Sequence, residues 1–188
     1  MRPLILLAGF LLVATELGAA PPPFRQTLKL QGITFKVECV KTGSGNNLTV
    51  TPKGLGRDNR KIQTKIDGTV VKAQVADLNG DRSPELYVFV RSDGSGSYGR
   101  VAAWSANRRL SLTEIFVPEP AEVSKKAAKG YMGHDEFDIV EGFLVRRFPI
   151  YRQGDVNAAP TGKTRQIQYK LHAGEAGWVM RPDKVVEF

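Results

Sequence analysis

Oxygen-bearing side chains stand at alternate positions of one short segment: Asp77, Asn79, Asp81, Ser83 and Glu85. Hard cations such as Ca²⁺ prefer oxygen ligands arranged around a tight loop. However, Arg82 stands where the usual calcium loop has Gly, and Val88 stands where its last carboxylate would be. A turn held by hydrogen bonds from Asx side chains uses the same residues without metal. We therefore expect a structural turn and no metal; the alternative is a calcium site formed by Asp77, Asn79, Asp81 and Glu85.

A second segment, Gly94 to Gly99, satisfies the G-x-G-x-x-G pattern of dinucleotide-binding loops. That pattern binds phosphates where a strand leads through the loop into a helix. The residues after Gly99 favour a strand instead, and the neighbouring segments have the pattern of hairpins. We expect no nucleotide role for this segment and no cofactor for the protein.

The serines of this segment could also belong to the catalytic triad of a hydrolase. Ser95 or Ser97 would be the nucleophile and His134 the base, and the candidates for the third member are Asp135, Glu136 and Asp138. Such a triad is defined by geometry rather than by order in the chain. The nucleophile-elbow pattern G-x-S-x-G is absent at both serines, and His172 is the only other histidine available for a metal site. We expect no enzyme.

The composition of the same segment favours a binding loop. From Asp93 to Gly99 the only large apolar side chain is that of Tyr98. An exposed loop of this kind presents one aromatic ring, two serine hydroxyls and an approachable backbone. Tyrosine is a favoured interface anchor because its large surface is ordered at low entropic cost and its hydroxyl forms hydrogen bonds. A flexible hairpin end without function is the alternative.

Three two-residue turns that end in glycine would position these segments: Gln31-Gly32, Asp67-Gly68 and Glu141-Gly142. Glycine supplies the positive φ that type I′ hairpin turns need. The β-rich runs joined by the turns are 27–30 with 33–39, 61–66 with 69–75, and 138–140 with 143–148. Each pair is therefore predicted to form an antiparallel hairpin.

Period-two alternation predicts further short strands at 48–51, 86–90, 101–104, 112–117, 165–171 and 177–180. The fold class is then all-β: an antiparallel β-sandwich or barrel built from hairpins, with at most one short helix, in residues 118–130. Cys39, the single cysteine, lies in an alternating strand and is expected to pack inward as a small hydrophobe.

The first 20 residues have the pattern of a secretory signal peptide, with Arg2, an apolar run from Leu4 to Val13 and small residues at 18–20. That run is too short to span a bilayer. We expect a signal peptide over 1–20, one β domain over 21–188 and no membrane span. The net charge is +8, from 27 Lys and Arg against 19 Asp and Glu, which favours an anionic partner. Because export separates the protein from nucleic acid, an acidic protein cleft or an anionic envelope surface remains.

Several segments resemble the periplasmic inhibitors of invertebrate-type (I-type) lysozyme. They are residues 77–81, 84–88, 92–99, 130–137, 147–151, 160–162 and 174–178. Within them, Ser95-Gly96-Ser97-Tyr98 matches the S-G-x-Y loop that these inhibitors insert into the active cleft of lysozyme. The resemblance implies that Ser95 and Tyr98 contact lysozyme and that Gly96 permits the turn. Arg109, next to Arg108 at the far end of the following strand, is a further candidate for charge-assisted contacts.

We therefore expect a periplasmic, non-enzymatic inhibitor whose partner is I-type lysozyme. The sequence is compatible with a monomer or a homodimer. Its binding residues are expected to be Ser95, Gly96, Ser97, Tyr98 and Arg109. The first alternative is a secreted β adhesion or interaction module supported by calcium in the loop Asp77–Glu85. The second alternative is a small envelope hydrolase.

Overall fold

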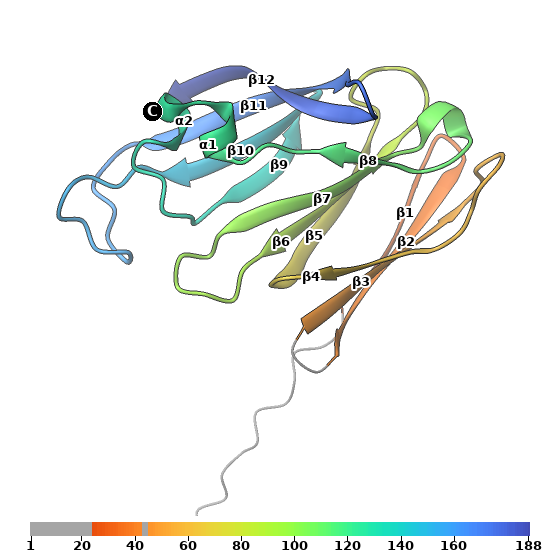
Figure 1. Cartoon of the computed structure of the whole chain (residues 1–188), viewed down its shortest axis with the longest axis horizontal. Coiled ribbons are helices and arrows are strands. Elements are labelled where there is room, and N and C mark those ends of the chain that lie inside the picture. The colour runs from red at the N-terminus through yellow and green to blue at the C-terminus, as the bar shows by residue number, and fades with distance from the viewer. Residues whose placement is uncertain (1–23, 43–44) are drawn as a thin grey trace, which may run out of the picture.

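The computed structural model describes residues 24–42 and 45–188, which fold into two β-sheets (Figure 1). The expected signal peptide lies outside these residues. In the described part of the chain, no helix is long and apolar enough to cross a membrane. The mainly β fold class predicted from the sequence is confirmed.

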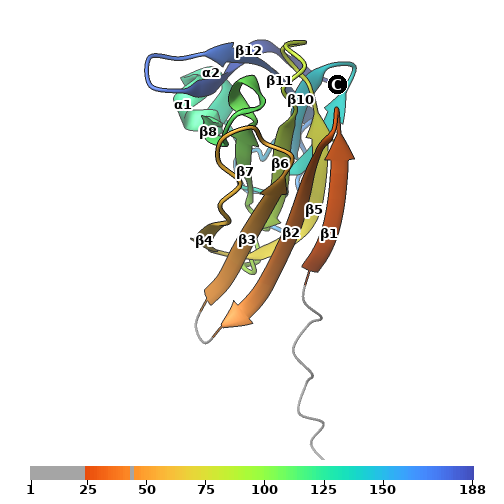
Figure 2. The same ribbon diagram turned by 90° about the vertical axis from the view of Figure 1, so that its right-hand side faces the viewer.

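The first sheet is an antiparallel meander in the order β1-β2-β3-β4 (Figure 2). Its strands are β1 Phe24–Leu30, β2 Ile33–Thr42, β3 Gly45–Lys53 and β4 Ile62–Ile66. The turn between β1 and β2 has φ values of 49° at Gln31 and 82° at Gly32, as a type I′ turn requires at both central residues. The predicted hairpin is therefore present.

The second sheet has the order β5-β6-β7-β8-β12-β11-β10-β9. Its strands are β5 Thr69–Ala76, β6 Glu85–Arg91, β7 Gly99–Ser105, β8 Thr113–Phe116, β9 Glu136–Val140, β10 Phe143–Pro149, β11 Thr164–Ala173 and β12 Trp178–Glu187. Glu141 and Gly142, with φ values of 51° and 81°, join β9 and β10 as predicted.

The second sheet curls into a nearly closed barrel. Its two edge strands, β5 and β9, are linked by side chains across the remaining seam. The carboxylate of Asp138 on β9 accepts hydrogen bonds from Lys72 Nζ at 2.7 Å and from Gln74 Nε2 at 2.9 Å, both on β5. Because unpaired strand edges are open to pairing with other chains, this contact also covers an otherwise exposed edge.

The predicted hairpin at Asp67-Gly68 is wrong. The preceding strand β4 pairs with β3, and the following strand β5 pairs with β6, so the turn carries the chain from one sheet to the other. Only Gly68 has a positive φ, of 109°, whereas a type I′ turn needs two such residues. A Cβ on Gly68 would collide with the backbone oxygen of Arg91, so this glycine allows β5 to begin close against the end of β6.

The connection over 118–130 contains two short helices where at most one was expected, α1 Pro120–Val123 and α2 Lys125–Ala128. Ser124 separates them. Its extended backbone, with φ −173° and ψ 160°, ends the first helix, and its hydroxyl accepts the N–H of Ala127 to cap the second. Serine is a preferred N-cap because its oxygen satisfies one of the N–H groups left free at a helix start.

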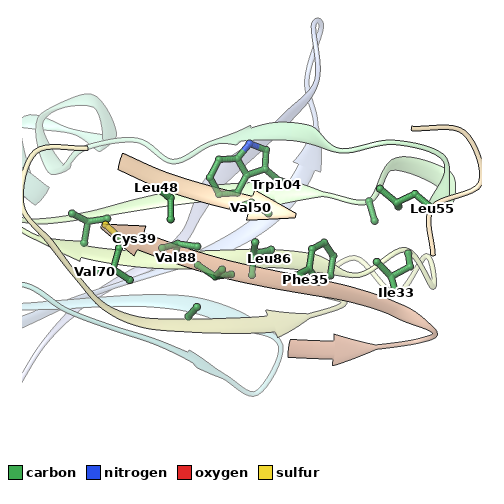
Figure 3. Close-up of a cluster of buried hydrophobic side chains, with 14 residues drawn as sticks. Ile33, Phe35, Cys39, Leu48, Val50, Leu55, Val70, Leu86, Val88 and Trp104 are labelled. Carbon is green, nitrogen blue, oxygen red and sulfur yellow. The ribbon is translucent and has the colours of Figure 1, made fainter. Parts of the chain in front are cut away.

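Two hydrophobic cores share strand β6, whose first six residues are all buried. Leu86, Val88 and Val90 face the first sheet and pack in a core that also contains Cys39, which is 6% exposed (Figure 3). Tyr87 and Phe89 face the barrel interior. Side chains alternate across a strand, so one continuous apolar run supplies both cores. The β6–β7 hairpin is therefore held from both sides, and the loop at its end is carried on a rigid support.

Candidate functional site

The loop Ser92–Tyr98 joins β6 to β7 and closes on itself through three hydrogen bonds. Ser92 N–H donates to Tyr98 O at 2.8 Å, and Tyr98 N–H donates to the Ser92 hydroxyl at 2.9 Å. Ser97 N–H donates to Gly94 O at 2.9 Å, which closes a tight turn over the tip. Asp93 also accepts a hydrogen bond from the Thr69 hydroxyl on β5 at 3.0 Å. The loop is therefore an ordered turn rather than a flexible end.

Gly96 is required for space and not for a left-handed backbone. A Cβ at this position would lie 2.5 Å from Cε2 of the Tyr98 ring and 3.3 Å from Met132 O. The positive φ in the turn belongs to Ser97 instead, at 43°. The family resemblance implied that Gly96 permits the turn; in the structure it lets the Tyr98 ring fold over the loop backbone.

The polar groups of the loop face outward. Tyr98 is 45% exposed, and its ring packs edge-on against Tyr131 with centroids 5.6 Å apart. Ser95 is exposed and Ser97 is half-buried. Among residues 24–42 and 45–188, the hydroxyls of Ser95, Ser97 and Tyr98 make no hydrogen bond to the rest of the chain. Three hydroxyl donors are thus held on one ordered surface.

A second segment, residues 131–135, braces the tip of the loop from behind. His134 N–H donates to Gly96 O at 2.7 Å. Gly133, with φ +90°, lies so close that a Cβ there would collide with the same carbonyl oxygen. Only glycine adopts this backbone without strain while leaving room for the approach. The resemblance included this segment without assigning it a role.

A buried ionic network fixes the base of the loop at Gly99, the residue after Tyr98. Gly99 N–H donates to Asp135 Oδ2 at 2.7 Å, and Gly99 O accepts from Arg146 Nη2 at 3.2 Å. Arg146 Nε and Asp135 Oδ1 form an ion pair of 2.7 Å, and the Tyr131 hydroxyl donates to the same carboxylate at 2.7 Å. Glu119 completes the network at 2.8 Å from Arg146.

The electrostatics of this network keep its charges in place. Burial alone would lower the pKa of Arg146, but the adjacent Asp135 and Glu119 carboxylates outweigh burial and raise it. Burial raises the pKa of Tyr131, so its phenol stays neutral and donates its proton to Asp135. Sequence patterns missed this network, because Arg146 is one of two adjacent arginines in an otherwise apolar strand and its partners lie elsewhere in the chain.

Exposed apolar side chains extend the surface around Tyr98. Met132 is 39% exposed, and Val156, in the segment 152–162, is 64% exposed. His134 Nε2 and Asn157 Oδ1 are 3.0 Å apart, which joins this segment to the one that braces the loop. Figure 1 shows the β6–β7 loop and the segment between β10 and β11 on the same side of the barrel. The resemblance reached this third segment only at residues 160–162 and assigned it no role.

The alternative sites in the loop are not assembled in the described residues. The ring of His134 contacts Asn157, and no hydrogen bond joins it to Ser95 or Ser97. The G-x-G-x-x-G pattern lies in a hairpin between two antiparallel strands, with no helix at its third glycine. The chemistry of a nucleotide-binding turn therefore has no structural basis here.

Arg108 and Arg109 lie at the opposite end of β7 from the loop. Both are exposed and have left-handed φ values, of 50° and 59°. The structure does not bring Arg109 together with Ser95 and Tyr98, because the whole length of β7 separates them.

The acidic segment Asp77–Glu85 also lies at that opposite end, where it connects β5 to β6 (Figure 1). Asp77, Asp81 and Glu85 each place a carboxylate oxygen within 4.8 Å of the others. Burial, with the nearby Asp77 and Asp81 carboxylates, raises the pKa of Glu85 to about 8. The predicted turn is present: Asp77 accepts the N–H groups of Asp81 and Arg82, both at 3.0 Å.

Taken together, the described residues form a β scaffold that presents one braced, hydroxyl-bearing loop. Residues 61–122, from β4 to the start of α1, match the model of the family described as periplasmic lysozyme inhibitor of I-type lysozyme (PliI). Neither the curated proteins nor the solved structures gave a significant match.

The matched family consists of lysozyme inhibitors and not of enzymes. The family name places its members in the periplasm. The matched residues include the β6–β7 loop, Arg109 and the acidic segment, but they end before the bracing residues His134, Asp135 and Arg146.

Proposed function

We propose that the protein inhibits I-type lysozyme by placing the β6–β7 loop in the active cleft of the enzyme. The observation that carries this proposal is the set of hydroxyls of Ser95, Ser97 and Tyr98, which are accessible and make no hydrogen bond within the described chain. The backbone beneath them is hydrogen-bonded on both sides. A loop of this kind is ready to donate outward.

The chemistry of the target suits such donors. A lysozyme cleaves its glycan with two carboxyl groups that face each other across the sugar-binding cleft. Hydroxyls inserted between these groups satisfy them with hydrogen bonds, and the loop excludes the sugar by occupying its space. The Tyr98 ring supplies apolar area beside these donors. No bond is made or broken, so inhibition is reversible.

The bracing contacts lower the cost of binding. Immobilising a side chain at an interface costs about 0.5–1.5 kcal/mol, and ordering a loop adds to that cost. Here the N–H of His134 and the carboxylate of Asp135 already hold the loop backbone at Gly96 and Gly99. More of the interaction energy therefore remains as affinity.

Arg109 enters the proposal only as a distant contact. It lies at the other end of β7, so it reaches lysozyme only if the interface extends along the barrel. Arg109→Ala tests this position separately from the loop: weaker inhibition places Arg109 in the interface, and unchanged inhibition removes it.

We also propose that residues 1–20 direct export and that residues 21–188 form one domain in the periplasm. The intact mass of the protein recovered from the periplasm tests the cleavage point. Cleavage elsewhere, or recovery only in the cytoplasm, would contradict it.

The decisive experiment is a lysis assay at several glycan concentrations. I-type, chicken-type and goose-type lysozymes are each mixed with the purified protein, and residual lysis is recorded. We expect competitive inhibition of the I-type enzyme and no mass increase of the lysozyme. An inhibition constant that does not depend on glycan concentration would exclude occupation of the cleft.

A further inference from the structure

Apart from the β6–β7 loop, a cluster of carboxylates at the β5–β6 connection has the composition of a ligand-binding site. One oxygen each from Asp77, Asp81 and Glu85 lies within 4.8 Å of the other two. Calcium binds oxygen at about 2.3–2.6 Å, so two ligands of one ion lie at most about 5 Å apart. None of the three carboxylates forms an ion pair with a described Lys or Arg. No basic side chain of the described residues therefore pairs with the cluster.

Glu85 provides an independent sign that something binds there. Its side chain is 0% exposed, and Oε2 accepts Leu78 N–H at 2.8 Å. Its other oxygen, Oε1, is buried and has no hydrogen-bond partner among the residues that the structure describes. A buried oxygen left unsatisfied is costly, and more so when it belongs to a carboxylate. This oxygen requires a cation or a trapped water.

Two further buried oxygens at this end of the barrel are also unsatisfied. One is the hydroxyl of Ser105, which stands directly opposite Glu85 in the β6–β7 ladder. The other is Oε1 of Gln31, whose amide nitrogen donates to Asp77 Oδ2 at 2.6 Å. Buried polar atoms in native proteins are nearly always paired, so each of these unsatisfied oxygens calls for a group outside the chain's own contacts.

The loop also has the backbone form of a calcium loop. Asn79 Oδ1 accepts Asp81 N–H at 3.1 Å, and Asp81 Oδ1 accepts Ser83 N–H at 2.7 Å, which draws these side chains around one centre. Carboxylate oxygens keep a second lone pair for a metal when they accept such bonds. Arg82, at the position where calcium loops need glycine for a sharp turn, has a φ of 62°.

These observations revise the expectation drawn from the sequence. One expected obstacle was Arg82 at the glycine position, but its side chain is exposed and forms no ion pair with the three carboxylates. Val88, the other obstacle, is buried in the first core, so the terminal carboxylate of an EF-hand is indeed absent. Glu85 compensates from inside the barrel.

We propose that Asp77, Asn79, Asp81 and Glu85 bind one divalent cation with the oxygen preference and size of Ca²⁺. The ion ties the end of β5 to the start of β6 and, through Gln31, to the β1–β2 turn of the other sheet. It stabilises the scaffold at the end away from the inhibitory loop. The site is independent of lysozyme binding, so either proposal can fail without the other.

The test is a calorimetric titration of the metal-free protein with calcium chloride, together with melting curves. We expect one ion per chain and a dissociation constant on the order of 10⁻⁴ M, as in extracellular calcium modules. The melting temperature rises by several degrees at millimolar calcium, because the ion binds the folded state. Magnesium produces a smaller rise, since it demands shorter bonds and keeps its waters.

Three variants and a matched control sharpen the result. Asp81→Asn, at an exposed position, and Glu85→Gln should each weaken calcium binding at least tenfold. Arg82→Gly, which removes a positive charge and relieves the left-handed backbone, should tighten it severalfold. Asp67→Asn, an equal charge change at the other end of β5, should bind calcium as the wild type does.

Two results would overturn the proposal. One is the absence of both heat and melting shift at millimolar calcium in the wild type, which is the outcome expected if a water occupies the site. The other is equal calcium affinity in the wild type, Asp81→Asn and Glu85→Gln.

Discussion

The carboxylate of Asp135 and the guanidinium of Arg146 lie 2.7 Å apart, with 0% and 1% of their side chains exposed. Asp135 also accepts a hydrogen bond from the N–H of Gly99, and Arg146 donates one to its carbonyl oxygen. The residue after Tyr98 is therefore held by a buried ion pair from another part of the chain. We expect this pair to set the direction in which the loop leaves the barrel, and so to support the proposed inhibition although it does not reach the surface.

Tyr98→Ala should weaken inhibition of I-type lysozyme by about 2 kcal/mol or more, roughly 30-fold, because an interface anchor is truncated. The melting temperature should change little, since nearly half of the side chain is exposed. Inhibition constants and melting curves measure the two effects. Phe116→Ala is the matched control, an aromatic residue 54% exposed on β8. Equal inhibition by the two variants would remove Tyr98 from the interface.

Ser95→Ala should weaken inhibition by about 1–3 kcal/mol, because one hydroxyl donor to a lysozyme carboxylate is lost. The hydroxyl makes no hydrogen bond within the described chain, so the free energy of unfolding should stay the same. Tyr98→Phe, which removes only a hydroxyl, gives a parallel measurement. If both variants inhibit as strongly as the wild type, hydrogen bonding does not explain the affinity.

Arg146→Met should destabilise the protein by about 3–5 kcal/mol, because it leaves the Asp135 carboxylate buried without its cation. It should also weaken inhibition, since Gly99 O loses a donor at the base of the loop. Denaturant unfolding and the lysis assay measure these losses. The double variant Arg146→Met with Asp135→Asn removes both charges and should recover part of the stability. A single variant as stable as the wild type would show that the pair does not hold the loop.

Asp138→Asn should reduce stability at neutral pH by roughly 0.2–1 kcal/mol, the usual range for an exposed ion pair. The hydrogen bond from Lys72, aided by Gln74, holds the pKa of Asp138 below its ordinary value of 3.8. A lowered folded-state pKa gives stability that is present above the unfolded pKa and lost as the pH falls through the folded one. The difference in melting temperature should therefore close below about pH 4. Asp67→Asn, which lacks an ion pair among the described residues, should show no such trend.

Local signals were sufficient to predict much of the fold. Gln31-Gly32 and Glu141-Gly142 each determine a turn from two residues, because the left-handed backbone is a property of the pair itself. Asp67-Gly68 has similar residues but joins two sheets, since the partner of β4 is chosen by the ladder with β3 and not by the turn. Strand pairing is decided by contacts between distant segments, which a two-residue pattern does not contain.

The candidate site also has parts that are determined by neighbouring residues and parts that are determined by distant ones. The loop with Ser95 and Tyr98 was predictable as a connection between strands, because its Gly- and Ser-rich composition lies within a few residues. Its role in binding stays a prediction. The residues that support the loop were not predictable. His134 contributes a backbone N–H, which almost any residue has. Arg146 binds the carbonyl oxygen of Gly99, which lies 47 residues earlier in the chain. For the acidic segment the residue types suggested calcium, but the burial of Glu85 that favours it is visible only in the folded chain.

Strand β6 contributes side chains to both hydrophobic cores, and this affects how the protein unfolds. Loss of the first sheet would expose Leu86, Val88 and Val90 to water, whereas loss of the barrel would expose Tyr87 and Phe89. Melting of either half would therefore expose apolar side chains of β6 that the other half does not cover. The two sheets should therefore unfold as one cooperative unit, and the amide protons of β6 should be among the slowest to exchange with solvent.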